Sequence, residues 1–293
     1  MDHSVIAPKT VLRDYYELSK PRIIVLLLIT TLAAMIMAAR GLPPIALVLW
    51  TLIGGALAAA SAGAFNCVYD ADIDRVMART QMRPIPQGRI SPRNAVLYAT
   101  AAGAAGFAIL YWLVNPLAAW LSLAGNAYYV VIYTMWLKRT TPLNIVIGGA
   151  AGSVPPLVGW AAVTHAIGGP ALGLFALIFL WTPPHFWSLS LVTEMDYEKA
   201  RIPMFPNVYG EERTKREIVY YSVILVLASL ALYPLHVMGA VYFAAAAVLG
   251  GIFLLEAIRT WRGDAKSCAR KLFRFSLVYL ALMCAVMVID RIA

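Results

Sequence analysis

Three polar residues at four-residue intervals, Asn66, Asp70 and Asp74, stand where a long apolar run ends. Each step of four residues on an α-helix turns the side chain by about 40°, so these three are predicted to share one helix face, whereas Asp72 points elsewhere. Two carboxylates and an amide oxygen on one face repel one another without a cation, and such hard oxygen ligands suit Mg²⁺. The spacing favours a magnesium site, but it also fits a solvated helix end in which Asp74 pairs with a neighbouring arginine.

A second acidic cluster, from Glu194 to Lys199, follows another apolar run. If both runs cross a membrane, this cluster lies at the same depth as Asp70 and Asp74. Asp196 then becomes a further candidate ligand for the same metal ion. The presence of two clusters strengthens the interpretation of either one as a site rather than a solvated helix end.

Basic side chains flank both acidic clusters. A carboxylate-bound metal surrounded by cations suits a diphosphate, because the metal and the Lys and Arg groups neutralise the charge that develops on a leaving group. For each basic residue, membrane topology or contact with anionic lipid is the alternative explanation. The candidate diphosphate ligands are Lys20, Arg22, Arg79, Arg83, Lys138, Arg139 and Lys199.

The composition indicates a membrane protein. Of 293 residues, 61% are hydrophobic and 13% are charged, whereas a soluble domain is about half apolar and about a quarter charged. The net charge of +9 is spread in short clusters between apolar runs, which argues against nucleic acid as a partner. The three cysteines form no CxxC pair and indicate no metal or redox site.

Apolar runs of about 20 residues predict nine transmembrane helices in one bundle. They cover approximately residues 22–40, 46–69, 95–114, 117–137, 144–163, 171–193, 219–237, 239–259 and 273–290. All but two of the 24 Lys and Arg residues fall in the N-terminal segment or in even-numbered connections; the exceptions are Arg40 and Arg291. The positive-inside rule therefore predicts a cytoplasmic N-terminus and an outside C-terminus.

We expect an all-α, polytopic membrane protein with a single domain over residues 1–293. Residues 1–18 are predicted to form a cytoplasmic N-terminal segment. The loops at about residues 70–94 and 194–218 are predicted to form the active site on the cytoplasmic side. The expected location is the plasma membrane, or cell inner membrane.

The first acidic pattern, followed by Arg79-Thr80 and Arg83-Pro84, resembles the first signature of the intramembrane prenyltransferase superfamily, which is typically nine-helical. Three further strings resemble its haem-modifying branch. They are TPLNIVIGGAAGSVPP at residues 141–156, WTPPHFW at residues 181–187, and Asp196-Tyr197 leading to IPMFP at residues 202–206. The resemblance covers nearly the whole chain from about Leu18.

Two positions depart from what the resemblance leads us to expect. Quinone-type members typically carry a second Asp-x-x-x-Asp, but Ala200 stands where the partner of Asp196 would be. This favours the haem branch over a quinone acceptor. Arg201 stands where many haem-branch members are expected to have glycine.

The resemblance implies that farnesyl diphosphate ionises at a Mg²⁺ site held by Asn66, Asp70, Asp74 and Asp196. A vinyl carbon of haem B attacks the allylic cation, and water quenches the new cation beside the pyrrole, giving haem O. The expected partners are farnesyl diphosphate, haem B and the lipid bilayer. Haem A synthase and a terminal oxidase assembly are candidate protein partners.

His185 follows Pro183-Pro184 within the sixth predicted span. Intramembrane ionisable residues usually face the bundle interior and serve function, and the double proline is expected to free backbone carbonyls and kink the helix. His185 could ligate haem iron, orient a propionate or help activate the quenching water. Alternatively, it hydrogen-bonds a freed carbonyl.

Two other functions stay open. The chain could prenylate a quinone or another lipid, or it could be a transporter or a haem-binding membrane protein without catalysis. Transporters often carry internal repeats and helices broken near the membrane midplane. No repeat is evident here, and the acids lie at the predicted membrane edge, so the sequence favours an enzyme.

Overall fold

The computed structural model describes residues 11–293, so Lys9 and most of the predicted N-terminal segment lie outside the described residues. Within residues 11–293 the chain is helical and contains no strand, which confirms the all-α class. The first elements are α1 (Val11–Leu18), α2 (Pro21–Ala39), α3 (Ile45–Tyr69), α4 (Ala71–Val76), α5 (Pro92–Leu113), α6 (Pro116–Ala127), the π-helix η1 (Tyr128–Leu137) and α7 (Lys138–Thr140). They are followed by α8 (Asn144–Ser153), α9 (Pro155–Thr164), α10 (Gly169–Val192), α11 (Glu194–Lys199), α12 (Phe205–Tyr209), α13 (Glu211–Ala231), α14 (Ala240–Arg262) and α15 (Ala265–Ile292).

Two helices begin where the sequence places a polar cap before proline. The side chain of Ser91 accepts a hydrogen bond from the backbone nitrogen of Asn94, and Pro92 occupies the first helical turn. The side chain of Asn115 accepts a hydrogen bond from the backbone nitrogen of Ala118 ahead of Pro116. Each cap satisfies one backbone donor that the helix itself leaves unpaired, and proline has no such donor to lose.

Seven helices are long and apolar enough to cross a membrane, which makes the chain a multi-pass membrane protein. They are Pro21–Ala39, Ile45–Tyr69, Pro92–Leu113, Asn144–Thr164, Gly169–Val192, Ala240–Arg262 and Lys266–Ile292. Nine spans were predicted. The fourth predicted span changes from α-helix to π-helix at Tyr128, so that neither part alone is long enough.

The boundaries of the seventh predicted span, residues 219–237, were wrong. The helix at this place, α13, begins at Glu211 and ends at Ala231. Glu211 and Glu212 lie in its first turn, where negative charge interacts favourably with the helix dipole. The helix ends before Pro234, because proline disfavours helical geometry in the residue that precedes it.

The two proline pairs within predicted spans differ in effect. At Pro155-Pro156 the fifth span breaks into α8 and α9. At Pro183-Pro184 the helix α10 continues, and the hydroxyl of Ser188 donates a hydrogen bond of 2.6 Å to the carbonyl of Pro184. A Pro-Pro pair therefore does not interrupt the sixth span.

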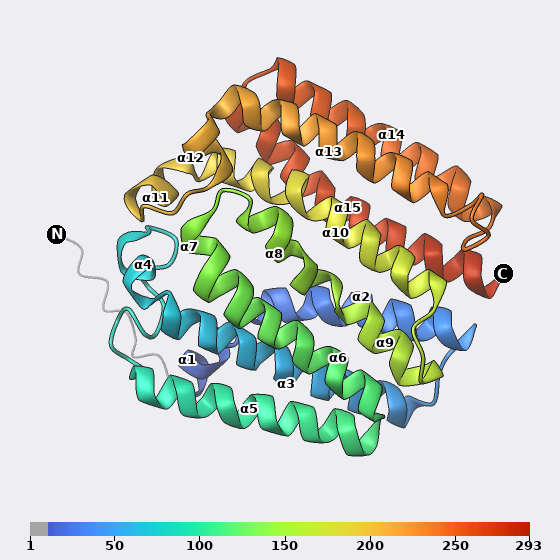
Figure 1. The fold of residues 1–293 in the computed structure, drawn as a ribbon, viewed down its shortest axis with the longest axis horizontal. Helices are drawn as coiled ribbons and strands as arrows, with labels where there is room; N and C mark the ends of the chain where they lie inside the picture. Colours follow the sequence, from blue (N-terminus) through green and yellow to red (C-terminus); the bar gives the residue numbers. More distant parts are fainter. Residues whose placement is uncertain (1–10) are drawn as a thin grey trace, which may run out of the picture.

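The helices pack into one bundle (Figure 1), in which α3 lies against α5 and α10 contacts α8, α13 and α15. Small residues permit the closest approach, since a Cβ on Gly106 would lie 2.8 Å from the carbonyl oxygen of Gly54. Figure 1 places α4, α7 and α11 together at one end of the bundle and the C-terminus at the opposite end. The segments that carry the candidate site residues thus meet at one end.

Candidate active site

The junction between α3 and α4 holds the first acidic pattern. Although Asp70 separates the two helices, the four-residue hydrogen bonding continues, from Asp70 N to the carbonyl of Asn66 at 2.9 Å and from Asp74 N to the carbonyl of Asp70 at 2.8 Å. Asn66, Asp70 and Asp74 are buried, whereas the side chain of Asp72 is 64% exposed. The side chains therefore divide as the helical spacing predicts, and the amide nitrogen of Asn66 donates a hydrogen bond of 2.8 Å to Oδ2 of Asp70.

Each of these three buried side chains contacts a cation. The ammonium group of Lys20 donates to the amide oxygen of Asn66, and Lys138 pairs with Oδ2 of Asp70. Arg83 pairs with Oδ2 of Asp74 at 2.7 Å. Burial lowers the pKa of Lys138, and the charge of Asp70 opposes that shift. Three of the predicted diphosphate ligands thus contact the buried acidic pattern directly.

Arg139 lies on the outer side of the same junction. Its guanidinium donates to both carboxylate oxygens of Asp72, at 2.7 and 2.8 Å, and lies over the ring of Tyr69. The hydrogen bond from Arg139 lowers the pKa of Asp72 to about 2. Arg139 also approaches Oδ1 of Asp70 at 3.8 Å. Asp72 therefore helps to hold a cation beside the buried acids without joining them.

One carboxylate oxygen of this site lacks a hydrogen bond. Oδ1 of Asp70 is buried and has no hydrogen-bond partner, an arrangement that costs free energy when a charged acceptor is removed from water. Within residues 11–293, no three His, Cys, Asp or Glu side chains lie close enough together to hold a metal ion by themselves. Any cation here would have to draw on an amide oxygen or on substrate oxygens as well.

The second acidic segment, α11, lies against α4 through neighbouring residues. A buried apolar cluster joins Ile73 of α4 to Ile202 and Met204 of the loop after α11. Burial raises the pKa of the Tyr197 phenol in α11, and the positive charge of Arg79 opposes that shift. The structure thus brings both predicted active-site loops together.

Three predicted site residues stand apart from these contacts. Within the described part of the chain, the side chain of Asp196 takes part in no hydrogen bond or ion pair, and it shares no three-acid group with Asp70 and Asp74. Arg22 and Lys199 are exposed, and neither side chain forms an ion pair or hydrogen bond with a residue in the range 11–293.

Two basic residues near the site have a left-handed backbone. Lys20, directly before α2, has a φ of 57°, and Arg201, after α11, has a φ of 52°. Residues with a Cβ rarely adopt this conformation, and departures from the common backbone regions concentrate at functional sites. The expectation of glycine at position 201 has this physical reason, and the chain adopts the turn with arginine instead.

Two residues that the sequence does not mark as functional, Thr134 and Gly63, support the site. The hydroxyl of Thr134 in η1 accepts a hydrogen bond of 3.0 Å from Asn66; its only signal is a single threonine in an apolar and aromatic run. Gly63 lets the turn before α2 approach α3, because a Cβ there would lie 3.2 Å from the carbonyl oxygen of Ser19. Both residues help to set where Asn66 and Lys20 meet.

His185 is buried within α10, and many residues separate it in sequence from Asp70 and Asp74. Its ring stacks between Trp181, at 4.1 Å between ring centroids, and Phe273, at 4.7 Å. Nδ1 lies 2.6 Å from the hydroxyl oxygen of Ser276 in α15. The alternative in which His185 bonds a carbonyl freed by the prolines is therefore wrong.

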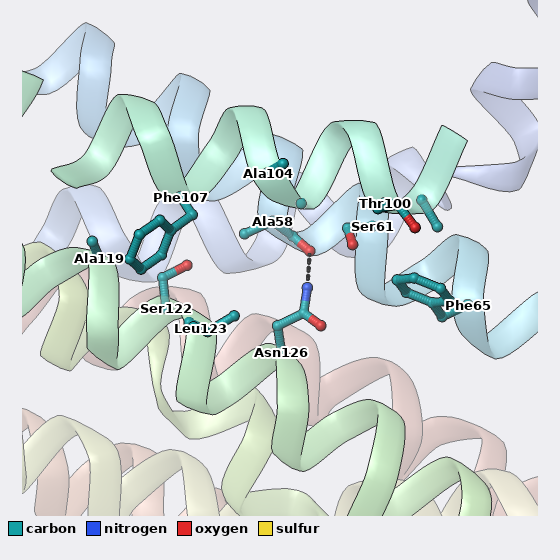
Figure 2. A pocket seen from close by; sticks show the side chains of 12 residues that line it. Ala58, Ser61, Phe65, Thr100, Ala104, Phe107, Ala119, Ser122, Leu123 and Asn126 are labelled. Atoms are coloured by element: carbon teal, nitrogen blue, oxygen red, sulfur yellow. Dashed lines mark hydrogen bonds between the residues drawn. The ribbon is translucent and has the colours of Figure 1, made fainter. Parts of the chain in front are cut away.

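A groove between α3, α5 and α6 is separate from these residues (Figure 2). It has a volume of about 260 Å³ and is lined by small side chains together with Phe65, Phe107 and Asn126. The amide nitrogen of Asn126 donates a hydrogen bond of 2.9 Å to the carbonyl of Ala58 beside it. No predicted site residue lines this groove.

Known proteins are similar to this chain in both sequence and fold. The profile of the UbiA prenyltransferase family matches residues 27–278. Protoheme IX farnesyltransferase of Synechocystis sp. is 53% identical over 285 residues, which cover 96% of this chain and 90% of that protein. The protoheme IX farnesyltransferase of Gloeobacter violaceus is 53% identical over 294 residues, which cover 99% of this chain and 96% of that protein.

Solved structures agree on the fold at lower identity. A structure from work on digeranylgeranylglyceryl phosphate synthase has a TM-score of 0.80 at 18% identity, covering 96% of this chain and 99% of its own. A UbiA homologue from Archaeoglobus fulgidus, bound to DMAPP and Mg²⁺, has a TM-score of 0.67 at 18% identity, covering 94% of this chain and 99% of its own. From the family match and the full-length relatives, the chain belongs to the UbiA prenyltransferase family.

Proposed function

We propose that this prenyltransferase transfers the farnesyl group of farnesyl diphosphate to a vinyl group of haem B and adds water, giving haem O. The observation that carries the proposal is 53% identity to a protoheme IX farnesyltransferase over 96% of the chain. The absence of a second Asp-x-x-x-Asp in the sequence, where position 200 is alanine, supports a haem rather than a quinone acceptor.

The diphosphate is bound by the cations that contact the buried acids. Lys20, Lys138 and Arg83 approach Asn66, Asp70 and Asp74 from three different segments. Ammonium and guanidinium groups that lie around one position can turn from carboxylate to phosphate oxygens. Positive charge held there stabilises the diphosphate as its bond to the allylic carbon breaks. Arg79 and Arg139 adjoin this position, and Arg22 and Lys199 would have to move toward it.

The same residues fit Mg²⁺. Oδ1 of Asp70 is a buried acceptor without a hydrogen bond, with only the guanidinium of Arg139 near it at 3.8 Å, and Asp74 and the amide oxygen of Asn66 supply further hard ligands. Asp196 would join them if α11 shifts or through a water molecule. The ion, when bound, neutralises charge on the diphosphate leaving group. A UbiA homologue solved with DMAPP and Mg²⁺ is consistent with this assignment.

The reaction breaks the bond between carbon 1 of the farnesyl group and the diphosphate oxygen, and the electron pair leaves with the diphosphate. A vinyl carbon of haem B forms the new carbon–carbon bond to the allylic cation. Water adds to the resulting cation beside the pyrrole and releases a proton. The apolar walls of the bundle shield the allylic cation from early capture by water. His185 faces the haem, as a ligand of its iron, a partner of a propionate or a base for the quenching water.

We further propose that the chain lies in the cell inner membrane with nine spans, a cytoplasmic N-terminus and an outside C-terminus. Continuity from α6 through η1 supports the fourth span, and the 21-residue length of α13 supports the seventh. The active-site loops then face the cytoplasm within a single domain. Haem A synthase or a terminal oxidase assembly is the expected recipient of the product.

The deciding experiment supplies purified protein with Mg²⁺, farnesyl diphosphate and either haem B or a quinone, and measures the products by mass. The proposal predicts that haem B alone is converted, to a species larger by one farnesyl group and one hydroxyl. Conversion of the quinone would favour the lipid-acceptor alternative. Binding of haem without conversion would favour a haem-binding protein.

A further inference from the structure

A chain of hydrogen bonds assigns the protonated nitrogen of His185. The hydroxyl of Ser276 donates to the backbone carbonyl of Phe273 at 2.7 Å. A carbonyl oxygen has no proton to give, so this contact is a hydrogen bond only when the single hydroxyl proton of Ser276 lies in it. The second contact of the hydroxyl oxygen, 2.6 Å from Nδ1 of His185, must then take its proton from the imidazole. In the neutral ring, Nδ1 carries the proton and Nε2 carries the lone pair.

Neighbouring side chains also fix the position of the His185 ring. Trp181 and Phe273 cover its two faces, with interplanar angles of 19° and 24°. The indole nitrogen of Trp181 donates a hydrogen bond of 2.8 Å to the backbone carbonyl of Ser276. One residue of α15 thus fixes both the histidine and the ring stacked on it. The clamp is made by the backbone of Ser276 on one side and by its hydroxyl on the other.

Nε2 is the ring nitrogen of His185 that remains available to a substrate. His185 is 7% exposed, and Nε2 forms no hydrogen bond within residues 11–293. It is not among the fully enclosed side-chain atoms that lack a partner. A histidine that donates from one nitrogen to a fixed acceptor presents the other as an electron-pair donor, as in sites where the second partner orients a metal-ligating or proton-accepting imidazole.

We propose that Ser276 is a positioning residue that holds His185 as the Nδ1–H tautomer and so presents the Nε2 lone pair to the haem substrate. The use of that lone pair rests on the proposed function. It would be offered either to the haem iron or to a proton of the quenching water. Ser276 itself touches neither.

The first test reads the tautomer without any reaction. Protein with ¹⁵N-labelled histidine is placed in lipid nanodiscs, and the ring nitrogen signals of His185 are assigned by their loss in His185→Gln. The proposal expects a protonated Nδ1 and an unprotonated Nε2. Ser276→Ala removes the hydroxyl but keeps the carbonyl that binds Trp181, so the clamp persists and the tautomer is expected to shift toward Nε2–H. Ser276→Thr retains a hydroxyl and is expected to retain the tautomer.

The second test follows turnover and haem binding on the same samples. Ser276→Ala is expected to lower haem conversion by about 10- to 100-fold, the usual effect of removing the partner that orients a histidine, while farnesyl diphosphate binding is unchanged. A matched control is Ser222→Ala, which removes another buried hydroxyl that donates to its own helix. A changed Soret band in Ser276→Ala assigns the lone pair to iron. An unchanged band, with farnesylated haem that lacks the hydroxyl, assigns it to water.

A protonated Nε2 in the wild type would overturn the proposal. So would Ser276→Ala with wild-type turnover, whether its tautomer shifts or not. A wild-type protein that has the Nδ1–H tautomer but converts no haem overturns the proposed function instead, and leaves the structural role of Ser276 in place.

Discussion

The side-chain amide of Asn66 donates a hydrogen bond of 2.8 Å to Oδ2 of Asp70, and Lys138 pairs with the same oxygen. One oxygen of this carboxylate is thus doubly bound, whereas Oδ1 has no hydrogen bond. The acidic pattern is neutralised by the chain's own cations on one side and remains open to a further cation on the other.

Replacing either buried acid by its amide is expected to remove turnover selectively. Asp70→Asn and Asp74→Asn should each lower turnover by at least about 100-fold, because each removes a charged oxygen that would hold Mg²⁺, and the Mg²⁺ stabilises the negative charge of the leaving diphosphate. Asp72→Asn is the matched control, since Asp72 is exposed and pairs outward with Arg139. Steady-state rates with saturating haem check this. A loss in Asp72→Asn equal to that in Asp70→Asn would contradict the assignment.

Stability and activity should separate in a double variant. Asp70 is 1% exposed and the side chain of Lys138 is 15% exposed, so Asp70→Asn leaves a buried ammonium without its partner and is expected to cost about 3 kcal/mol. Adding Lys138→Met removes that stranded charge and should recover most of the loss. Thermal unfolding in detergent measures the first effect. The double variant should remain inactive, and recovered activity would count against both residues.

The alkaline limit of activity should report Lys138. Burial holds its pKa below the ordinary value of 10.5, so the free protein loses this positive charge at a pH below 10.5. Burying the charged ammonium lowers the stability of the fold. This cost is fully present below the pKa of Lys138 in the folded protein, and it is relieved as pH rises from that pKa toward 10.5. As pH rises, the value of kcat/KM for farnesyl diphosphate should therefore begin to decrease before pH 10.5 is reached. Lys138→Arg should move this limb upward, because guanidinium stays charged; an unmoved limb would exclude Lys138 as its source.

Relief of the backbone at position 201 should stabilise the protein. Arg201 has a φ of 52°, a conformation that costs a residue with a Cβ roughly 1–2 kcal/mol and costs glycine almost nothing. Arg201→Gly should therefore raise the unfolding free energy by up to about 1 kcal/mol after the greater chain entropy of glycine is deducted. Arg201→Ala removes the same charge but keeps the Cβ. Equal melting temperatures for the two variants would show that the charge, not the backbone, matters.

Thiol labelling should fix the orientation. Cys67 and Cys284 are buried, and Cys268 is partly exposed near the start of α15. Impermeant maleimide should leave Cys268 unmodified in intact cells and modify it in inverted vesicles, because the proposed topology puts the preceding loop in the cytoplasm. Cys268→Ser is the control for labelling at the two buried thiols. Modification from outside intact cells would reverse the proposed topology.

The local pattern of the site could be predicted from the sequence, because helical periodicity alone decides that Asn66 and Asp70 share a face and Asp72 does not. The resemblance to the haem branch also predicts glycine at position 201, which agrees with the left-handed backbone there. The cations that contact these acidic side chains could not be predicted from the sequence. Lys138 meets Asp70 across 68 residues of chain, and no short-range rule states which of several cations will do so.

Other features depend on packing between distant segments. Ser276 looks like an ordinary hydroxyl in an apolar run, and only the contact of α15 with α10 gives it a role. The π-helix η1 replaces the expected regular helix without a proline or glycine between Tyr128 and Leu137 to signal it. The length of α13 was misjudged because its charged first turns read as loop, although Glu211 and Glu212 suit a helix N-terminus.

Haem farnesylation is measured most directly by the mass of the haem recovered after purified protein is incubated with Mg²⁺, farnesyl diphosphate and haem B. We expect haem enlarged by one farnesyl group and one hydroxyl, formed by the wild type and by Asp72→Asn but not by Asp70→Asn. Unmodified haem from the wild type in the presence of Mg²⁺ would contradict it, as would the same product in equal amount from Asp70→Asn.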